Sequence, residues 1–240
     1  LGLALLLSFV STLICLILAY PLAMILSEKN VNQTSFIVLI FILPMWMNFL
    51  LRTYSWMSIL ENNGLLNQLF QQIGLIDLYN QIAMHFASDP AAYVPIDHFQ
   101  MIGTQGAVVL GMVYNYLPFM ILPIYSVLVK LDHSLIEAAR DLGASSVQVF
   151  RKVILPLSLP GVLSGITMVF VPSVSTFAIS KMLGGGTEML LGDLIEQQYM
   201  GGAYNPYLGA AISLVMMVIV VICMVVMNRF GEGEEQAVMM

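Results

Sequence analysis

Five long apolar runs dominate this sequence and limit what it can fold into. They cover roughly Leu3–Leu26, Thr34–Leu60, Gly106–Val129, Pro160–Met182 and Tyr207–Asn228. Each run is long enough to cross the hydrocarbon core of a bilayer, which takes about 20 helical residues. Because lipid offers backbone amides no hydrogen-bond partner, each run is predicted to be a helix. The chain is therefore expected to be an all-α integral membrane protein with five spans.

The composition excludes a soluble fold. The 240 residues are 59% hydrophobic and only 9% charged, whereas soluble domains carry about 25% charged residues. The net charge of −6 argues against a nucleic-acid partner, which selects a basic surface. Cys15 and Cys223 both lie in apolar runs, so we interpret them as buried hydrophobic residues. No metal site is predicted, because no residues have metal-ligand spacing.

The basic residues predict the orientation of the chain. Six of the 8 Lys and Arg residues lie on one side of the predicted spans: Lys29, Lys130, Arg140, Arg151, Lys152 and Arg229. The positive-inside rule puts this side, and the C-terminus, in the cytoplasm. Because the chain begins within an apolar run, we expect an earlier span to precede it in the intact protein.

These assignments predict one transmembrane domain over residues 1–230. A cytoplasmic loop is expected at 130–159, external loops at 61–103 and 183–206, and an acidic cytoplasmic tail at 231–240. Within the second external loop, residues 188–200 are predicted to be amphipathic and to lie at the outer mouth.

The cytoplasmic loop carries signals of two short helices. Gly143 falls where a residue that follows a helix end belongs, and Pro156 is predicted to stop the second helix. Two pairs have the spacing of capping boxes: Ser134 with Glu137, and Ser145 with Gln148. The loop is therefore expected to be helix, turn, helix. It either docks a partner or merely links two spans, and the residues alone leave both open.

The same loop resembles the signature of ATP-binding-cassette (ABC) importer permeases. The pattern is EAA, three residues, Gly, nine residues, an apolar residue, any residue and Leu-Pro, with Val153 where Ile is usual. Stretches at 48–60, 63–77, 111–132 and 155–170 are similar to the spermidine/putrescine permease subfamily, the first of its two permease subunits. The resemblance implies the type I ABC importer (MetI-like) permease fold, with six spans when intact and the first one absent here.

In that family the loop docks on a cytoplasmic ATPase subunit. The resemblance therefore implies that a set of loop residues contacts the ATPase: Ser134, Leu135, Glu137, Ala138, Ala139, Arg140, Asp141, Gly143, Leu155 and Pro156. It also implies a second homologous permease subunit, a dimeric ATPase, an extracytoplasmic polyamine-binding protein, and a bacterial plasma membrane. The sequence has no P-loop, so no catalytic residue or cofactor is expected here. ATP and Mg²⁺ would be bound by the ATPase.

Polar and aromatic residues near the spans are candidates for a substrate pathway, because polar groups in lipid are costly and often functional. The candidates are Trp46, Asn48, Arg52, Tyr54, Trp56, Tyr114, Asn115, Tyr116, Tyr125, Ser173, Ser175, Thr176, Asp193 and Glu196. Aromatic faces and carboxylates suit a polyamine, with cation–π contacts contributing ~0.5–2 kcal/mol each. Asn48, Arg52 and Trp56 are predicted to share a helix face. For Arg52 a structural role is favoured, since the substrate would be cationic: the side chain either extends to the outer interface or pairs with an acid. Packing remains an equal alternative for the candidates of the third and fourth spans, whereas a solvated loop acid is the favoured interpretation of Asp193 and of Glu196.

The leading function is a permease subunit of an ATP-driven polyamine importer. The nearest alternative is an ABC permease for another small solute. A transporter driven by an ion gradient is expected to carry an acid in the centre of a span, and none is predicted there. An intramembrane enzyme is less favoured still, because no metal pair or Ser/His set lies in the spans.

Overall fold

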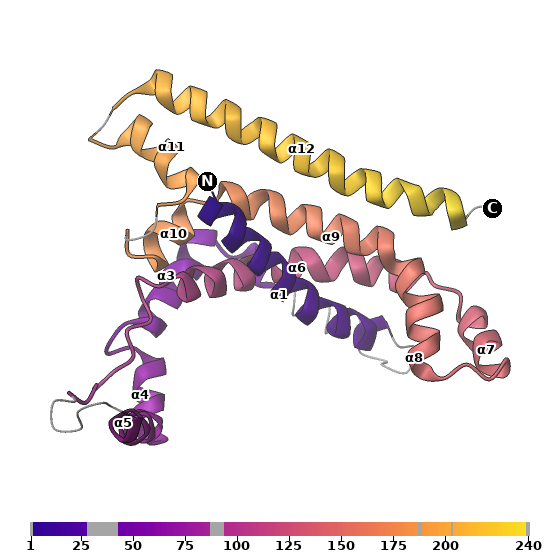
Figure 1. Cartoon of the computed structure of the whole chain (residues 1–240), viewed down its shortest axis with the longest axis horizontal. Coiled ribbons are helices and arrows are strands. Elements are labelled where there is room, and N and C mark those ends of the chain that lie inside the picture. The colour runs from indigo at the N-terminus through magenta and orange to yellow at the C-terminus, as the bar shows by residue number, and fades with distance from the viewer. Residues whose placement is uncertain (1, 28–42, 87–93, 187–188, 203, 239–240) are drawn as a thin grey trace.

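A computed structural model describes residues 2–27, 43–86, 94–186, 189–202 and 204–238. All regular elements within these residues are helical. Four of them are long and apolar enough to cross a membrane, and they form one elongated bundle (Figure 1). These are α1 (Gly2–Ser27), α6 (Gln105–Leu128), a composite helix over Ser146–Ser175, and α12 (Pro206–Val238). The predicted all-α membrane fold is confirmed, and α1, α6 and α12 each begin within one residue of the predicted start.

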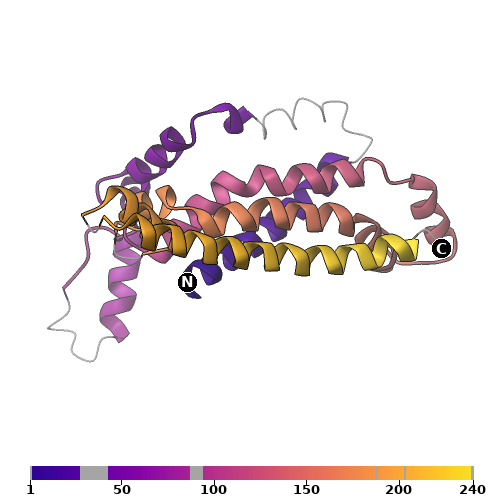
Figure 2. The ribbon, with the colours of Figure 1, turned by 90° about the horizontal axis from the view of Figure 1, so that it is seen from above.

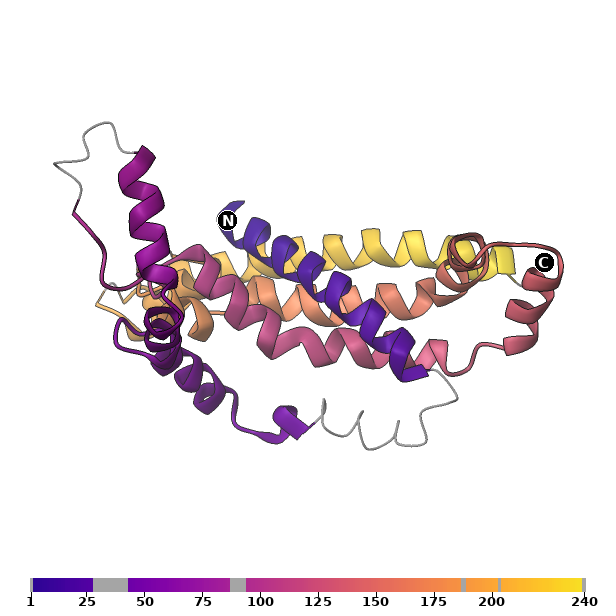
Figure 3. The same ribbon diagram turned by 90° about the horizontal axis from the view of Figure 1, so that it is seen from below.

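The core lies where α1, α6 and α9 (Leu155–Ser175) meet. Small residues bring α6 and α9 together: a Cβ atom at Gly161 would lie 2.8 Å from the carbonyl oxygen of Pro123. Small residues at helix contacts are typical of membrane bundles, where close backbone approach replaces the hydrophobic effect between helices. A hydroxyl pair, Tyr20 with Ser158 at 2.6 Å, adds a buried polar link between α1 and α9. Figure 3 shows α1 crossing the other spans obliquely.

The last span lies at the edge of the bundle. α12 packs mainly on α9 and on α11 (Leu191–Met200), and Figure 2 shows it along one side. Only 6% of its span window is buried inside the chain. Because its mean hydropathy is also the highest of the four spans, at 2.9, α12 is suited to contact lipid or another apolar transmembrane surface.

The second predicted span is not one continuous helix in its described part, so that prediction is wrong there. A short 3₁₀ helix, η1 (Leu43–Trp46), is followed by a break and then by α3 (Phe49–Leu60). The reason is local: the Asn48 side chain accepts a hydrogen bond from the Leu50 N–H at 2.8 Å and caps α3, a role that competes with helix continuation. Residues 34–42 of the predicted span lie outside the described residues.

The fourth predicted span is also corrected. Pro156 does not stop a helix: α8 (Ser146–Val149) continues through a π-helical segment, η3 (Phe150–Ile154), directly into α9. In η3 the Leu155 N–H bonds to the Phe150 carbonyl, five residues back. Pro156, which has no N–H to donate, directly follows this wide turn as the second residue of α9.

The far end of the same predicted span is interrupted. α9 ends at Ser175, Thr176 is extended with φ −66° and ψ 140°, and α10 (Ala178–Leu183) begins two residues later. Pro172 removes a backbone donor from the last turn of α9, and Ser175 donates to the Pro172 carbonyl at 3.2 Å. The helix therefore ends here and does not continue to the predicted end of the span at Met182.

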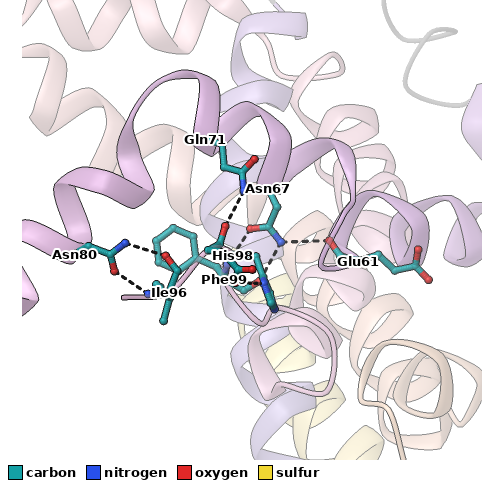
Figure 4. A network of polar contacts seen from close by, with 8 residues as sticks. Glu61, Asn67, Gln71, Asn80, Ile96, His98 and Phe99 are labelled. Atoms are coloured by element: carbon teal, nitrogen blue, oxygen red, sulfur yellow. Dashed lines mark hydrogen bonds and ion pairs between the residues drawn. The ribbon is translucent and has the colours of Figure 1, made fainter. Parts of the chain in front are cut away.

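The two ends of the bundle differ in build. α7 (His133–Asp141) and α8 lie at one end, and α3, α4 (Leu65–Gln72), α5 (Leu75–Phe86), α10 and α11 gather at the other (Figure 1). α4 and α5 hold an extended segment through side-chain amides (Figure 4). Asn67 bonds to both the N–H and the carbonyl of Phe99, at 2.9 and 3.0 Å, and Asn80 does the same with Ile96.

Candidate functional site

The α7 helix begins with a different cap from the one predicted. Asp132 is the N-cap residue, and its carboxylate accepts a hydrogen bond from the Ser134 N–H at 2.9 Å. The predicted capping box of Ser134 with Glu137 is therefore wrong. Because Asp132 lies before the first helical residue, its carboxylate meets the free N–H groups there, and Ser134 falls inside the helix.

The turn between α7 and α8 follows the predicted signals. Gly143 has φ +82°, and its N–H donates to the Arg140 carbonyl at 2.8 Å. The Ala144 N–H donates to the Ala139 carbonyl at 3.1 Å. These two bonds form a Schellman motif, which ends a helix with a residue in the left-handed region. The predicted role of Gly143 is confirmed.

The second helix of the pair starts as predicted. The Ser145 N–H donates to the Gln148 side-chain oxygen at 2.9 Å, and the Gln148 N–H donates to the Ser145 hydroxyl at 3.4 Å. This reciprocal pair is a capping box. Since both ends of the turn are fixed by local bonds, α7 and α8 form a rigid unit.

The predicted ATPase-contact residues divide between two places. Most are exposed on α7 and its turn: Ser134, Leu135, Glu137, Ala138, Arg140, Asp141 and Gly143, with Ala139 half-buried. Leu142 beside them is 89% exposed. Leu155 and Pro156 are half-buried in the helix that enters the bundle. A helix pair that exposes leucines among charged residues has the mixed surface typical of a protein contact.

α7 packs on η3 and faces the ends of two spans across a cavity. A cavity of about 210 Å³ lies beneath it, lined by Met24 and Ser27 of α1, Leu128 and Leu131 near the end of α6, His133, Ile136 and Arg140 of α7, and Ile154. Because α7 packs on η3, which continues into α9, a movement of α7 would displace the start of α9.

The opposite end brings several predicted pathway residues together. Arg52 on α3 is only 7% exposed, and its Nε and Nη1 atoms have no hydrogen-bond partner among the described residues. It interacts electrostatically with Tyr116 of α6, which also lies beside Thr176. The Tyr116 hydroxyl donates to the Pro172 carbonyl at 3.4 Å. The acid expected to pair with Arg52 is not among the described residues.

An aromatic pair lies beside this cluster. The Trp56 and Tyr114 rings meet edge to face, with centroids 5.3 Å apart. Trp56 is one helical turn beyond Arg52, so the two share a face of α3. The predicted face does not include Asn48, which caps the helix instead.

The other candidates in the spans bond mainly within their own helices, although the Asn115 side-chain oxygen is buried without a hydrogen-bond partner among the described residues. Asn115 donates to the Gly111 carbonyl at 2.9 Å, and Ser173 donates to the Phe170 carbonyl at 2.8 Å. Ser175 bonds back within α9 in the same way. Each of the three side chains therefore donates to a carbonyl of its own helix. Trp46, Asn48, Tyr54 and Ser175 are exposed, and Tyr125 is half-buried towards the α7 end of α6.

The two acids of α11 have structural partners. Asp193 is 7% exposed and accepts a hydrogen bond from the Leu190 N–H at 2.9 Å. Burial raises the pKa of Asp193, while the Ser180 hydroxyl and the Leu190 N–H lower it. Glu196 forms an ion pair with Lys181 of α10 at 2.7 Å. Both acids therefore tie α11 to its surroundings.

Comparison with known proteins identifies the family. Residues 1–232 match the model of the binding-protein-dependent transport system inner membrane component. The chain belongs to this family. It is thus a multi-pass inner membrane protein and an ABC transporter permease.

Named relatives of the permease include spermidine/putrescine transporters. The spermidine/putrescine transport system permease protein PotB of Haemophilus influenzae is 34% identical over 225 residues, which cover 94% of this chain and 72% of PotB. PotB of Escherichia coli strain K12 is 34% identical over 222 residues, which cover 92% of this chain and 74% of that PotB. The inner membrane ABC transporter permease protein YdcU of the same strain is 29% identical over 222 residues, which cover 92% of this chain and 67% of YdcU.

Solved structures share the permease fold. A bacterial ABC transporter that imports the acidic polysaccharide alginate has a chain that superposes with a TM-score of 0.70 at 16% identity, covering 96% of this permease and 77% of that chain. The MetNI methionine ABC transporter, in an inward-facing conformation, gives a TM-score of 0.60 at 21% identity, covering 99% and 93%. The predicted ABC importer permease fold is confirmed.

Sequence reasoning missed two residues that shape the permease's ends. Asp132 was overlooked as a cap, although Asp directly before a helical run is itself a start signal. Asn67 is 1% exposed and bonds to the backbone of Phe99, but its neighbours in the sequence do not indicate this role. Its partner is 32 residues away in the sequence, so only the folded chain reveals the contact.

Proposed function

We propose that the permease is a transmembrane subunit of an ATP-driven polyamine importer. The observation that carries this proposal is the 34% identity to spermidine/putrescine permeases along 94% of the chain. In this function the chain forms half of a translocation path, and a second homologous permease subunit forms the other half. A dimeric ATPase and an extracytoplasmic polyamine-binding protein complete the transporter.

The α7–α8 unit is the proposed contact with the ATPase. This end of the bundle carries Lys130, Arg140, Arg151 and Lys152, so the positive-inside rule supports its assignment to the cytoplasm, together with the C-terminus. Leu135 and Leu142 give the unit an exposed apolar surface, with Glu137 and Arg140 at its border. ATP and Mg²⁺ are held by the ATPase, and this chain supplies the surface that follows its movement.

The helix geometry supports a mechanical role for that surface. From Ser146 to Ser175 the backbone is helical without a break, so a displacement of α8 is transmitted directly to α9. α9 packs on α1, α6 and α12. When ATP binding closes the ATPase dimer, differential contacts at the α7–α8 unit shift the permease between inward- and outward-facing states.

The test is transport by the complete complex in liposomes. ATP-dependent uptake of labelled spermidine and putrescine is measured for the wild type, Leu142→Asp and Leu65→Asp. Both leucines are exposed, 89% and 68%, so neither change disturbs a core, but Leu65 lies at the opposite end. We expect Leu142→Asp to lose most ATP-coupled uptake and Leu65→Asp to keep it. Full uptake by Leu142→Asp would refute the docking surface, and uptake of an anion instead of polyamines would refute the substrate class.

A second candidate is an ABC permease for another small solute. The fold neighbours include transporters of alginate and of methionine, so the fold itself does not select a cation. The same uptake assay, repeated with other labelled solutes, separates the two candidates.

A further inference from the structure

One charge inside the bundle has no counterion in the described part of the chain. Arg52 is 7% exposed, and two of its three guanidinium nitrogens are buried without an acceptor. The ion pairs among described residues involve other side chains. A buried charge without a partner is costly, and in a membrane protein such a group marks function more often than stability.

The position of Arg52 links three helices at one end of the bundle. α3 packs on α6 and α10, and Arg52 interacts with Tyr116 beside the break at Thr176. One turn along α3, Trp56 meets Tyr114. The unpaired charge therefore lies next to an aromatic pair and a helix break. Broken helices are tolerated at membrane depth where they line a transport path.

Two simpler roles fit the geometry poorly. A polyamine would be repelled by a fixed positive charge, so Arg52 is a poor direct ligand for it. An acid from another subunit is also a poor fit for two of the three nitrogens, because Nε and Nη1 are covered by this chain's own atoms. Such an acid could reach only the 7% of the side chain that is exposed. What remains is the effect of the charge itself on ions in the path.

That effect is strong at short range. At an effective dielectric constant of 20, a fixed charge about 7 Å away lowers the local concentration of a monovalent cation by roughly 50-fold. A transporter for large organic cations needs such a barrier, because a path wide enough for them would otherwise also pass K⁺ and Na⁺. Arginine serves this purpose in other membrane pores that exclude small cations.

We propose that Arg52 is an electrostatic barrier that stops inorganic monovalent cations from leaking along the α3–α6 side of the path while the transporter rests. This inference rests on the proposed function, since it requires the path to pass this cluster. The organic cation passes when α3 swings aside. Met47 and Asn48 are not helical, and they would act as the hinge of this movement.

The experiment measures K⁺ efflux from liposomes that contain the complete complex, without ATP and without polyamine. Arg52→Gln removes the charge, Arg52→Lys keeps it, and Ser55→Ala is a matched change at an exposed position of α3. We expect Arg52→Gln to raise K⁺ efflux about tenfold or more, and the other two variants to match the wild type. Equal efflux from Arg52→Gln and the wild type would overturn the barrier. Equal leakage by Arg52→Gln and Arg52→Lys would also overturn it, because shape rather than charge would then matter.

A second measurement needs no variant. In the wild-type complex the residual leak should pass Cl⁻ more readily than K⁺, and the reverse preference contradicts a positive barrier. Both readouts are independent of the substrate. If the wild type fails to import polyamines while the leak results hold, the substrate proposal fails and the barrier stands.

Discussion

The contact between α6 and α9 allows a quantitative test of how the bundle is held together. A Cβ atom at Gly161 would lie 2.8 Å from the Pro123 carbonyl oxygen, 2.9 Å from Val127 Cγ2 and 3.2 Å from Ile124 Cα. Carbon–oxygen contacts normally fall at about 3.3–3.6 Å. Gly161→Ala therefore forces the two helices apart by roughly half an ångström, because two of the three obstacles are backbone atoms that cannot rotate away.

The expected cost follows from that displacement. Overpacking of a tight core costs about 1–3 kcal/mol, and the better helix propensity of Ala returns at most about 1 kcal/mol. Gly106→Ala on α6 is the matched control, since the nearest atom to its added Cβ would be Thr104 Oγ1 at 3.8 Å. The difference between the two variants isolates the clash, so Gly161→Ala should be less stable than Gly106→Ala by about 1–3 kcal/mol.

The assay is denaturant unfolding of the purified permease in detergent, followed by the circular dichroism of its helices. Both variants are measured beside the wild type at the same protein and detergent concentrations. If Gly161→Ala and Gly106→Ala unfold at the same midpoint with the same slope, the close approach of α9 to α6 does not hold in solution. The reasoning about the core would then be refuted.

Three further outcomes are expected. Gly143→Val places a β-branched residue at φ +82°, which costs about 1–2 kcal/mol. ATP-coupled uptake should therefore fall, while the thermal midpoint of the spans changes little. Unchanged uptake would contradict a rigid turn. Asn67→Ala removes three hydrogen bonds, so limited proteolysis within 61–103 should quicken, whereas the exposed control Asn62→Ala should cleave at the wild-type rate. The raised pKa of Asp193 means that the folded state binds its proton more tightly than the unfolded state, so its contribution to stability falls as the pH rises from 3.8 through the raised pKa. In Asp193→Asn the thermal midpoint should no longer fall with pH over this range. The same pH dependence of the midpoint in the variant and the wild type would count against the assignment.

The fold was predictable where the pattern is continuous. α1, α6 and α12 follow long apolar runs, and their starts were predicted to within one residue. The predictions failed where one residue's local bonding competes with the run. Asn48 caps a new helix inside the second run, and Pro156 is accommodated by a π turn instead of ending a helix. Average hydropathy does not register either effect.

The candidate sites show the same division. The turn at Gly143 and the capping box at Ser145 use neighbours within a few residues, so the sequence contains all the information they need. The surroundings of Arg52 depend on contacts between α3, α6 and α10, and Tyr116 is 64 positions away (116 − 52 = 64). Spacing within one helix predicts which residues share a face, but not which helix covers that face.

The π turn at Phe150–Ile154 fixes the number of residues that must lie between α8 and α9. A π turn accommodates one more residue than an α turn, with little added rise. Deleting a single residue there would leave an ordinary α-helix, and α8 and α9 would keep the faces that they now present. The narrower turn would press the ring of Pro156 against the carbonyl four residues back. Natural length variation between the α7–α8 unit and the bundle is therefore expected to occur together with loss or gain of proline at this position.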